Sequence, residues 1–142
     1  MRSLLDVNVL IALLDQDHAS HARAMAWFQA HAQTGWASCP LTQNGCVRIM
    51  SHAGYPNALS TRDVMARLSE ATRHQSHAFW ADSVSLLDSN VVNATRIHGP
   101  KQLTDIYLLA LAVANEGRLV TFDKTIALES VINARRSRLL FL

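Results

Sequence analysis

Near the start of the chain stands the stretch Leu4-Leu5-Asp6-Val7-Asn8-Val9-Leu10-Ile11, in which an acid interrupts a largely apolar run. Residues 3–5 predict a short buried strand, and the apolar residues after Asp6 recur at helical spacing. Asp6 is therefore expected at the carboxyl end of the strand. An ionised carboxylate in apolar surroundings is costly unless it is paired, hydrogen-bonded or bound to metal, so Asp6 is the first candidate for chemistry.

Outward from this stretch, predicted strands alternate with predicted helices. Further apolar strands are expected at residues 36–39, 83–87, 119–122 and 139–142. Helical patterns cover about 19–33, 42–50, 61–73, 89–98, 104–115 and 125–133. Strands that are apolar on both faces and separated by helices indicate an α/β protein, with three α/β/α layers and a central, mainly parallel sheet.

Composition sets the broad class of the protein. The chain has 142 residues, 49% hydrophobic and 17% charged, which suits one domain over residues 1–142. A net charge of +2 permits an anionic partner such as nucleic acid without demanding one. Cys39 and Cys46 form no metal or disulfide pattern, and neither a secretory leader nor a membrane span is apparent. We therefore expect a soluble, cytoplasmic protein.

Three acids are expected to meet at one edge of the sheet. Asp6 and Asp123 each follow a predicted strand, and Asp105 opens the helix that leads to the second of these strands, with Thr104 as its N-cap. In open α/β sheets the binding crevice lies beyond the carboxyl ends of the strands. Convergent carboxylates repel one another unless a cation lies between them, and Mg²⁺ or Mn²⁺ suits such oxygen ligands. Metal-assisted phosphodiester chemistry is the implied reaction.

Each acid also has a structural explanation. Asp105 at a helix start interacts favourably with the helix dipole, and Asp123 after a strand can cap the following turn. Four basic residues lie near the proposed crevice in sequence and could contact RNA phosphates: Arg48, Lys101, Arg118 and Lys124.

Three segments resemble the acidic motifs of PIN-domain ribonucleases: residues 4–11, residues 102–110 (QLTDIYLLA) and residues 118–123 (RLVTFD). Residues 39–49 (CPLTQNGCVRI), and Phe79-Trp80 ahead of residues 84–88 (VSLLD), further resemble VapC-type toxins of type II toxin–antitoxin systems. The similarity covers nearly the whole chain, in the same order and spacing.

This resemblance implies a PIN-like fold and an endoribonuclease toxin that cleaves cellular RNA with Mg²⁺, or Mn²⁺ as a substitute. It implies that Asp6, Asp105 and Asp123 bind metal and orient the attacking water, with Asn8 and Thr121 in supporting positions. A cognate antitoxin that neutralises the enzyme and a homodimer are the implied protein partners.

One position departs from the family pattern. PIN nucleases usually carry a further acid after the second strand, and here Gln43 is the nearest match. An amide can ligate metal through its oxygen or hydrogen-bond a water, but it cannot act as a general base. An alternative is therefore a weakened or inactive PIN module that binds RNA or a partner without cutting. An aspartyl phosphatase is disfavoured, because Asn8 stands where its second Asp is required.

Overall fold

A five-stranded parallel sheet forms the centre of the computed structural model, which describes all residues, Met1–Leu142. Its strands lie in the order β3-β2-β1-β4-β5, and every pairing is parallel. The strands are β1 (Ser3–Leu5), β2 (Trp36–Ser38), β3 (His77–Phe79), β4 (Arg118–Thr121) and β5 (Leu139–Phe141). The predicted parallel sheet is thus confirmed, and Leu4 and Leu5 of the opening stretch lie in its central strand.

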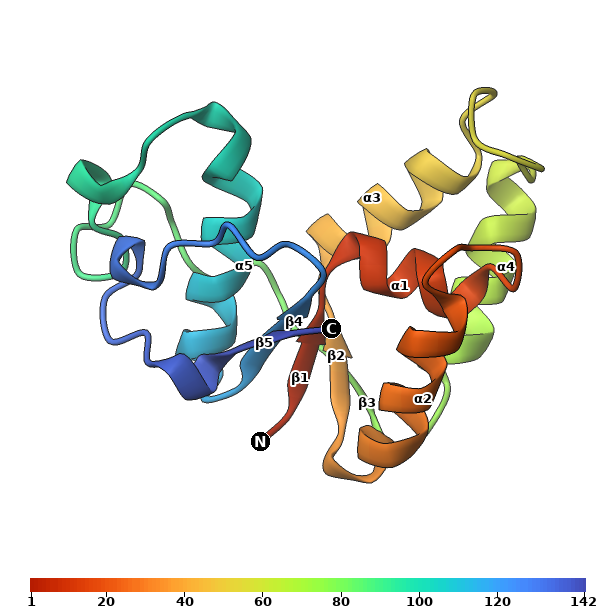
Figure 1. The fold of residues 1–142 in the computed structure, drawn as a ribbon, viewed down its shortest axis with the longest axis horizontal. Helices are drawn as coiled ribbons and strands as arrows, with labels where there is room; N and C mark the ends of the chain where they lie inside the picture. Colours follow the sequence, from red (N-terminus) through yellow and green to blue (C-terminus); the bar gives the residue numbers. More distant parts are fainter.

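Helices cover both faces of the sheet (Figure 1). They are α1 (Val7–Leu14), α2 (His21–His31), α3 (Pro40–Met50), α4 (Thr61–Thr72) and α5 (Leu103–Ala114). Adjacent strand residues point to opposite faces: Leu4 packs in the core under α5, and Leu5 packs in the core under the other four helices. This arrangement is the expected three-layer α/β/α architecture.

One predicted strand is wrong. Residues 83–87 form a loop in which Leu87 is 96% exposed, and the third strand is His77–Phe79 instead. β3 pairs with β2 in register, and the His77 ring packs on the Trp36 ring with centroids 4.4 Å apart. As an edge strand, β3 has only half-buried and exposed residues, so it lacks the apolar run that a buried strand requires.

Two predicted helices are also wrong. Residues 89–98 and 125–133 contain only the single 3₁₀ turns Ala94–Arg96 and Leu128–Ser130. The Asn93 carboxamide accepts hydrogen bonds from Thr95, a local side-chain bond that competes with helix formation. An antiparallel bridge between Val92 and Val131 then joins the two segments beside α5.

The two longest helices, α4 and α5, have 12 residues each. No helix of the structure combines the length and the apolar character needed to cross a bilayer.

Candidate active site

Asp6 lies directly after β1 and is the N-cap of α1. Its backbone N–H donates to the Val120 carbonyl at 3.0 Å, which continues the β1–β4 pairing by one residue. Its carboxylate accepts from the Val7 N–H at 2.6 Å and from the Thr121 hydroxyl at 2.8 Å. The residue is only 5% exposed, and burial is the main reason that the pKa of Asp6 is raised. The position predicted for Asp6 at a strand end is confirmed.

Thr121 connects Asp6 with Asp123. Its buried hydroxyl donates to Asp6 and accepts from the Asp123 backbone N–H at 3.0 Å. The Asp123 carboxylate in turn accepts from the Thr125 hydroxyl at 2.6 Å and from the Thr125 N–H at 2.7 Å, and these bonds lower the pKa of Asp123. Thr125 was missed by the sequence reasoning, although an Asp followed two residues later by Thr is a common Asx-turn signal.

Asp105 reaches the same place from the opposite layer. It lies in the first turn of α5, which begins at Leu103, so the expected N-cap role of Thr104 is wrong. The pKa of Asp105 is raised to about 7, mainly by burial and then by the negative charges of Asp6 and Asp123 and a hydrogen bond shared with Asp123. Because each of these charges acts on Asp105, the structure brings the three predicted acids into one cluster.

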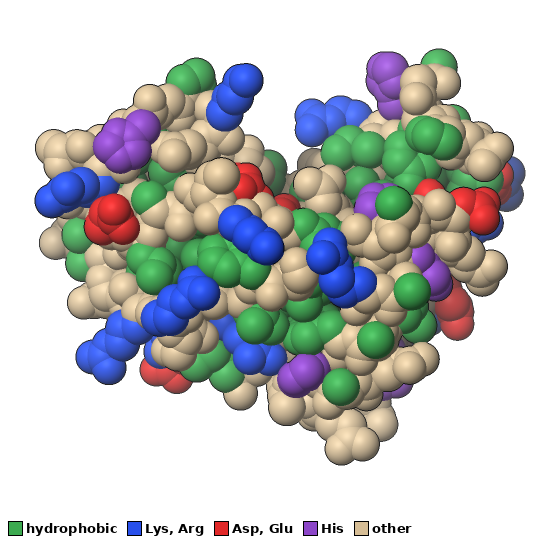
Figure 2. Space-filling model, in the orientation of Figure 1, with side chains coloured by type: hydrophobic (Ala, Val, Ile, Leu, Met, Phe, Trp, Pro, Cys, Tyr) green, Lys and Arg blue, Asp and Glu red, His purple; other side chains and the backbone are tan.

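The molecular surface is hollowed between the two lobes of the molecule. Figure 2 shows acidic side chains at the base of a depression between the lobe that carries α5 and the lobe that carries α3, with Lys or Arg side chains on both rims. An anionic chain such as RNA would meet positive charge at the rims and carboxylates at the base. Such a polyanion needs a compensating cation where its phosphate meets those carboxylates.

The donor set suits a hard divalent cation, because all three side chains offer carboxylate oxygens that repel one another. As placed, no group of three or more His, Cys, Asp or Glu side chains surrounds a point where a metal ion would sit. The Asp6 oxygens are already engaged by Val7 and Thr121. The side chains therefore have ligand chemistry suited to metal without a closed ligand cage.

The predicted supporting and RNA-contacting residues lie in different parts of the fold. Asn8 is exposed in the first turn of α1, and its side chain makes no hydrogen bond. Lys101 is exposed in the 3₁₀ turn Pro100–Gln102 just ahead of α5, and Lys124 is exposed directly after Asp123. Arg118 lies at the first residue of β4, so it is at the amino ends of the strands, and its guanidinium donates to Ser3. The expectation that Arg118 lies near the crevice at the carboxyl ends is therefore wrong.

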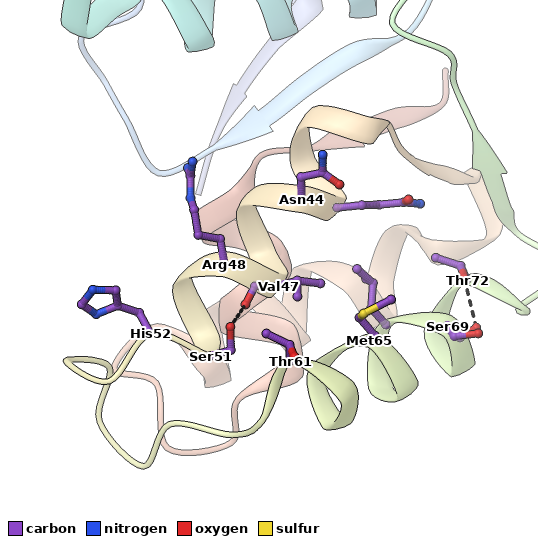
Figure 3. Close-up of a pocket in the computed structure, with 11 residues that line it drawn as sticks. Asn44, Val47, Arg48, Ser51, His52, Thr61, Met65, Ser69 and Thr72 are labelled. Carbon is purple, nitrogen blue, oxygen red and sulfur yellow. Dashed lines mark hydrogen bonds between the residues drawn. The ribbon is translucent and has the colours of Figure 1, made fainter.

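Gln43 lies on the face of α3 that looks toward α4. Its amide nitrogen donates to the Ser38 hydroxyl at 2.9 Å, and no hydrogen bond joins it to any of the three acids. The α3 residue packed against Val7, beside Asp6, is Gly45. The proposed catalytic role of Gln43 stays a prediction, and its contacts favour a role in the groove between α3 and α4, where Arg48 also lies (Figure 3).

Comparison with known proteins agrees with this geometry. No protein-family model matches the chain. It is 53% identical over 139 residues to Ribonuclease VapC44 of Mycobacterium tuberculosis (strain ATCC 25618 / H37Rv), covering 98% of both chains. It is 40% identical over 128 residues to Ribonuclease VapC39 of the same strain, covering 89% of this chain and 92% of the relative. The solved structure of VapBC2 from Rickettsia felis, bound to a DNA fragment from their promoter, superposes on this chain with a TM-score of 0.57 at 13% sequence identity. The superposition covers 87% of this chain and 89% of that chain, so it supports the fold.

Proposed function

This chain belongs to the VapC family of ribonucleases, and on that premise we propose that it is a metal-dependent endoribonuclease toxin held in check by a cognate antitoxin. The observation that carries the proposal is the cluster of three acids: Thr121 joins Asp6 to Asp123, and both charges act on Asp105. Carboxylates that come from both layers of the fold have no structural purpose in repelling one another, whereas metal-assisted hydrolysis requires them.

Each acid has a distinct part in this proposal. The hydrogen bonds from Val7 and Thr121 fix the orientation of the Asp6 carboxylate, and Thr125 does the same for Asp123. Asp105 has a pKa of about 7, so its carboxylate can take up a proton near neutral pH. Mg²⁺ or Mn²⁺ held by these three residues would supply positive charge to the phosphate and acidify a bound water. Lys101 and Lys124 would position the RNA backbone.

The test is cleavage of a random-sequence single-stranded RNA by purified protein freed of antitoxin, with Mn²⁺ or with EDTA. We expect cleavage with Mn²⁺, none with EDTA, and a loss of at least about a hundredfold in Asp105→Asn. Glu129→Gln, which changes an exposed acid in the 3₁₀ turn Leu128–Ser130, is the matched control and should cleave normally. RNA that stays intact in every arm would contradict the proposal and favour a PIN module that binds without cutting.

An antitoxin segment has a suitable docking place on the other side of α1. A groove of about 270 Å³ between α1, α2 and α4 is lined by ten residues, eight of them hydrophobic, among them Leu14, Met25 and Phe28. An apolar helix of an antitoxin would cover this surface. Leu14→Glu and Met25→Glu should each weaken the complex with the product of a neighbouring antitoxin gene, measured by titration calorimetry. Unchanged affinity in both would place the antitoxin elsewhere.

A homodimer, implied by the family resemblance, is also part of the proposal. Light scattering of the purified protein during size-exclusion chromatography tests it directly, and a mass near 15.7 kDa would contradict it.

A further inference from the structure

We propose that the groove between α3 and α4 binds one nucleotide of single-stranded RNA beside the catalytic acids, and that Gln43 reads the edge of its base. This inference rests on the proposed nuclease function and specifies a subsite for its substrate. The groove has a volume of about 760 Å³, within the usual size of small-ligand sites.

The lining of the groove suits a base and its sugar. Val47, Met65 and Leu68 form an apolar floor, and the Met65 side chain is 59% exposed there. Polar groups surround this floor: amides on α3, and the hydroxyl residues Thr61, Ser69 and Thr72 from α4 (Figure 3). An apolar platform edged by hydrogen-bonding groups is the usual arrangement for an unstacked RNA base.

The orientation of the Gln43 amide is fixed by a chain of hydrogen bonds. The chain begins at His77, whose ring bonds the backbone of Thr72. This bond raises the pKa of His77, so it favours the protonated ring nitrogen, and a ring N–H is the donor. The other ring nitrogen, Nε2, lies 2.8 Å from the Ser38 hydroxyl. In the neutral ring, which burial favours by lowering the pKa of His77, Nε2 must accept from Ser38.

Ser38 is then left as the acceptor for Gln43. Its hydroxyl hydrogen is used by His77, so its oxygen accepts from Gln43 Nε2 at 2.9 Å. The Gln43 oxygen has no protein donor and, with the second amide hydrogen, is available to the groove. One acceptor beside one donor, held in a fixed orientation, is the pattern that pairs with the edge of a base.

The groove begins at the same edge of the sheet as the acids, because α3 starts directly after the carboxyl end of β2. Gly45 packs on Val7, the residue after Asp6, and Leu41 contacts the core under α5. Asn44 and Arg48, four residues apart on one face of α3, line the rim of the groove that lies farther from α4. Figure 3 shows both side chains rising from α3 on the side away from α4. A strand of RNA crossing this rim would place one base in the groove and continue toward the acids at the carboxyl edge of the sheet.

Charge favours RNA over a peptide as the occupant. None of the eleven residues that line the groove is acidic, and Arg48 and His52 are among them. A polyanion is attracted by this positive charge. The apolar groove between α1, α2 and α4 is the better match for a helical protein segment.

The first experiment compares the wild type with Gln43→Leu. Fluorescence anisotropy in EDTA measures the affinity for labelled oligoadenylate, oligocytidylate and oligouridylate, and sequencing of the fragments cut from random-sequence RNA with Mn²⁺ gives the base preference around the cut. We expect affinity for the preferred homopolymer to fall about 5- to 100-fold, and base preference to be lost at one position. Gln29→Leu, an exposed glutamine on α2, is the matched control and should change neither.

A second variant tests the positioning role of Ser38. Ser38→Ala leaves Gln43 in the groove but releases its amide, so base preference at the same position should relax while cleavage continues. Thermal unfolding of each variant checks that the fold is kept. Unchanged base preference in Ser38→Ala would remove Ser38 and His77 from the recognition.

The outcomes separate this inference from the function on which it rests. If the wild type cuts RNA and Gln43→Leu keeps the same affinities and base preference, the groove is not a base subsite, although the nuclease stands. If the wild type cuts nothing, the nuclease fails, and the anisotropy of Gln43→Leu still decides whether the groove binds RNA. Loss of antitoxin affinity in Gln43→Leu with unchanged RNA binding would overturn the inference in favour of a protein occupant.

Discussion

Asp105 makes the stability of the metal-free protein depend on pH in a defined direction. Its pKa is about 7 in the folded protein against an ordinary value of 3.8, so between these values the folded chain holds a proton that the unfolded chain releases. Stability should therefore fall as the pH rises from about 4 to about 7. Asp105→Asn removes this proton uptake, and it should unfold at a higher temperature than the wild type above pH 7, measured by scanning fluorimetry in EDTA.

Below about pH 4 the advantage of Asp105→Asn should vanish, because Asp105 is then protonated in both states. Glu129→Gln, which changes an exposed acid away from the cluster, should follow the wild type at every pH. An Asn variant that is less stable than the wild type above pH 7 would show that Asp105 is not under repulsion in the folded protein.

Thr121 links two of the three acids through a single buried hydroxyl. Thr121→Val keeps the shape of the side chain but leaves Asp6 Oδ2 without a donor and the Asp123 N–H without an acceptor. Unfolding by urea should show a loss of about 1–3 kcal/mol, the cost of unsatisfied buried polar groups. RNA cleavage should also fall, since the Asp6 carboxylate then keeps only its bond from Val7 and the backbone of Asp123 loses its bond to Thr121.

Thr121→Ser is the matched variant, because it retains the hydroxyl and loses only a methyl group. It should retain most of the cleavage activity despite a stability loss of about 1 kcal/mol. Equal activity in the Val and Ser variants would show that the hydroxyl does not position the acids.

At the scale of elements, the packing of α3 on α1 depends on the absence of a side chain at Gly45. A Cβ there would lie 2.9 Å from Val7 Cγ2 and 3.3 Å from Val7 Cγ1. Alanine gains about 1 kcal/mol of helix propensity over glycine. Valine in a helix has essentially one rotamer and cannot move aside, so the overpacking cost of about 1–3 kcal/mol should prevail.

Gly45→Ala is therefore expected to lower both stability and cleavage, because the displaced Val7 donates its N–H to Asp6. Val7→Ala in the same chain should restore much of the loss, and a double-mutant cycle on urea unfolding measures the coupling. Additive effects of the two substitutions would mean that the two residues do not compete for space.

How far the sequence predicts these elements depends on burial. β1 and β4 are central strands with apolar pairs, Leu4-Leu5 and Leu119-Val120, that are buried. The acids that follow these strands could therefore be placed at the carboxyl edge of the sheet from sequence alone. β3 is an edge strand with a half-buried His77, and no apolar run distinguishes it from a loop. Residues 83–87 do contain apolar side chains, but these residues form a loop, and Val84 and Leu86 pack from it against the core beside α5.

The position of Gln43 illustrates what spacing along the chain cannot give. Each residue of a helix turns its side chain by about 100°, so an uncertainty of one or two positions decides whether a residue faces the acids or the opposite groove. The register of α3 is set by tertiary packing, with Gly45 against α1 and Leu41 against the core under α5. Neither contact is visible before the helices are assembled around the sheet.

For the whole molecule, the acid cluster is the point where the two layers of helices meet. Asp6 and Asp123 extend from neighbouring strands of the sheet, and Asp105 comes from the helix that covers its other face. Repulsion among the three opposes this approach in the metal-free protein. A bound divalent cation would reverse the sign of that interaction and hold α5 against the sheet.

Metal binding should therefore stabilise the whole protein and release protons. With free Mn²⁺ at about a hundred times its dissociation constant, the free energy of unfolding should rise by roughly 3 kcal/mol. Because the cation favours the ionised form of Asp105, whose pKa is about 7 without it, binding near pH 6 should release close to one proton. Calorimetric titration in two buffers of different ionisation enthalpy measures this release. Asp105→Asn should release almost no protons on binding Mn²⁺. Amide hydrogen exchange at the start of α5 should slow on addition of Mn²⁺ in the wild type and stay unchanged in Asp105→Asn. Binding without proton release in the wild type would place the metal away from Asp105.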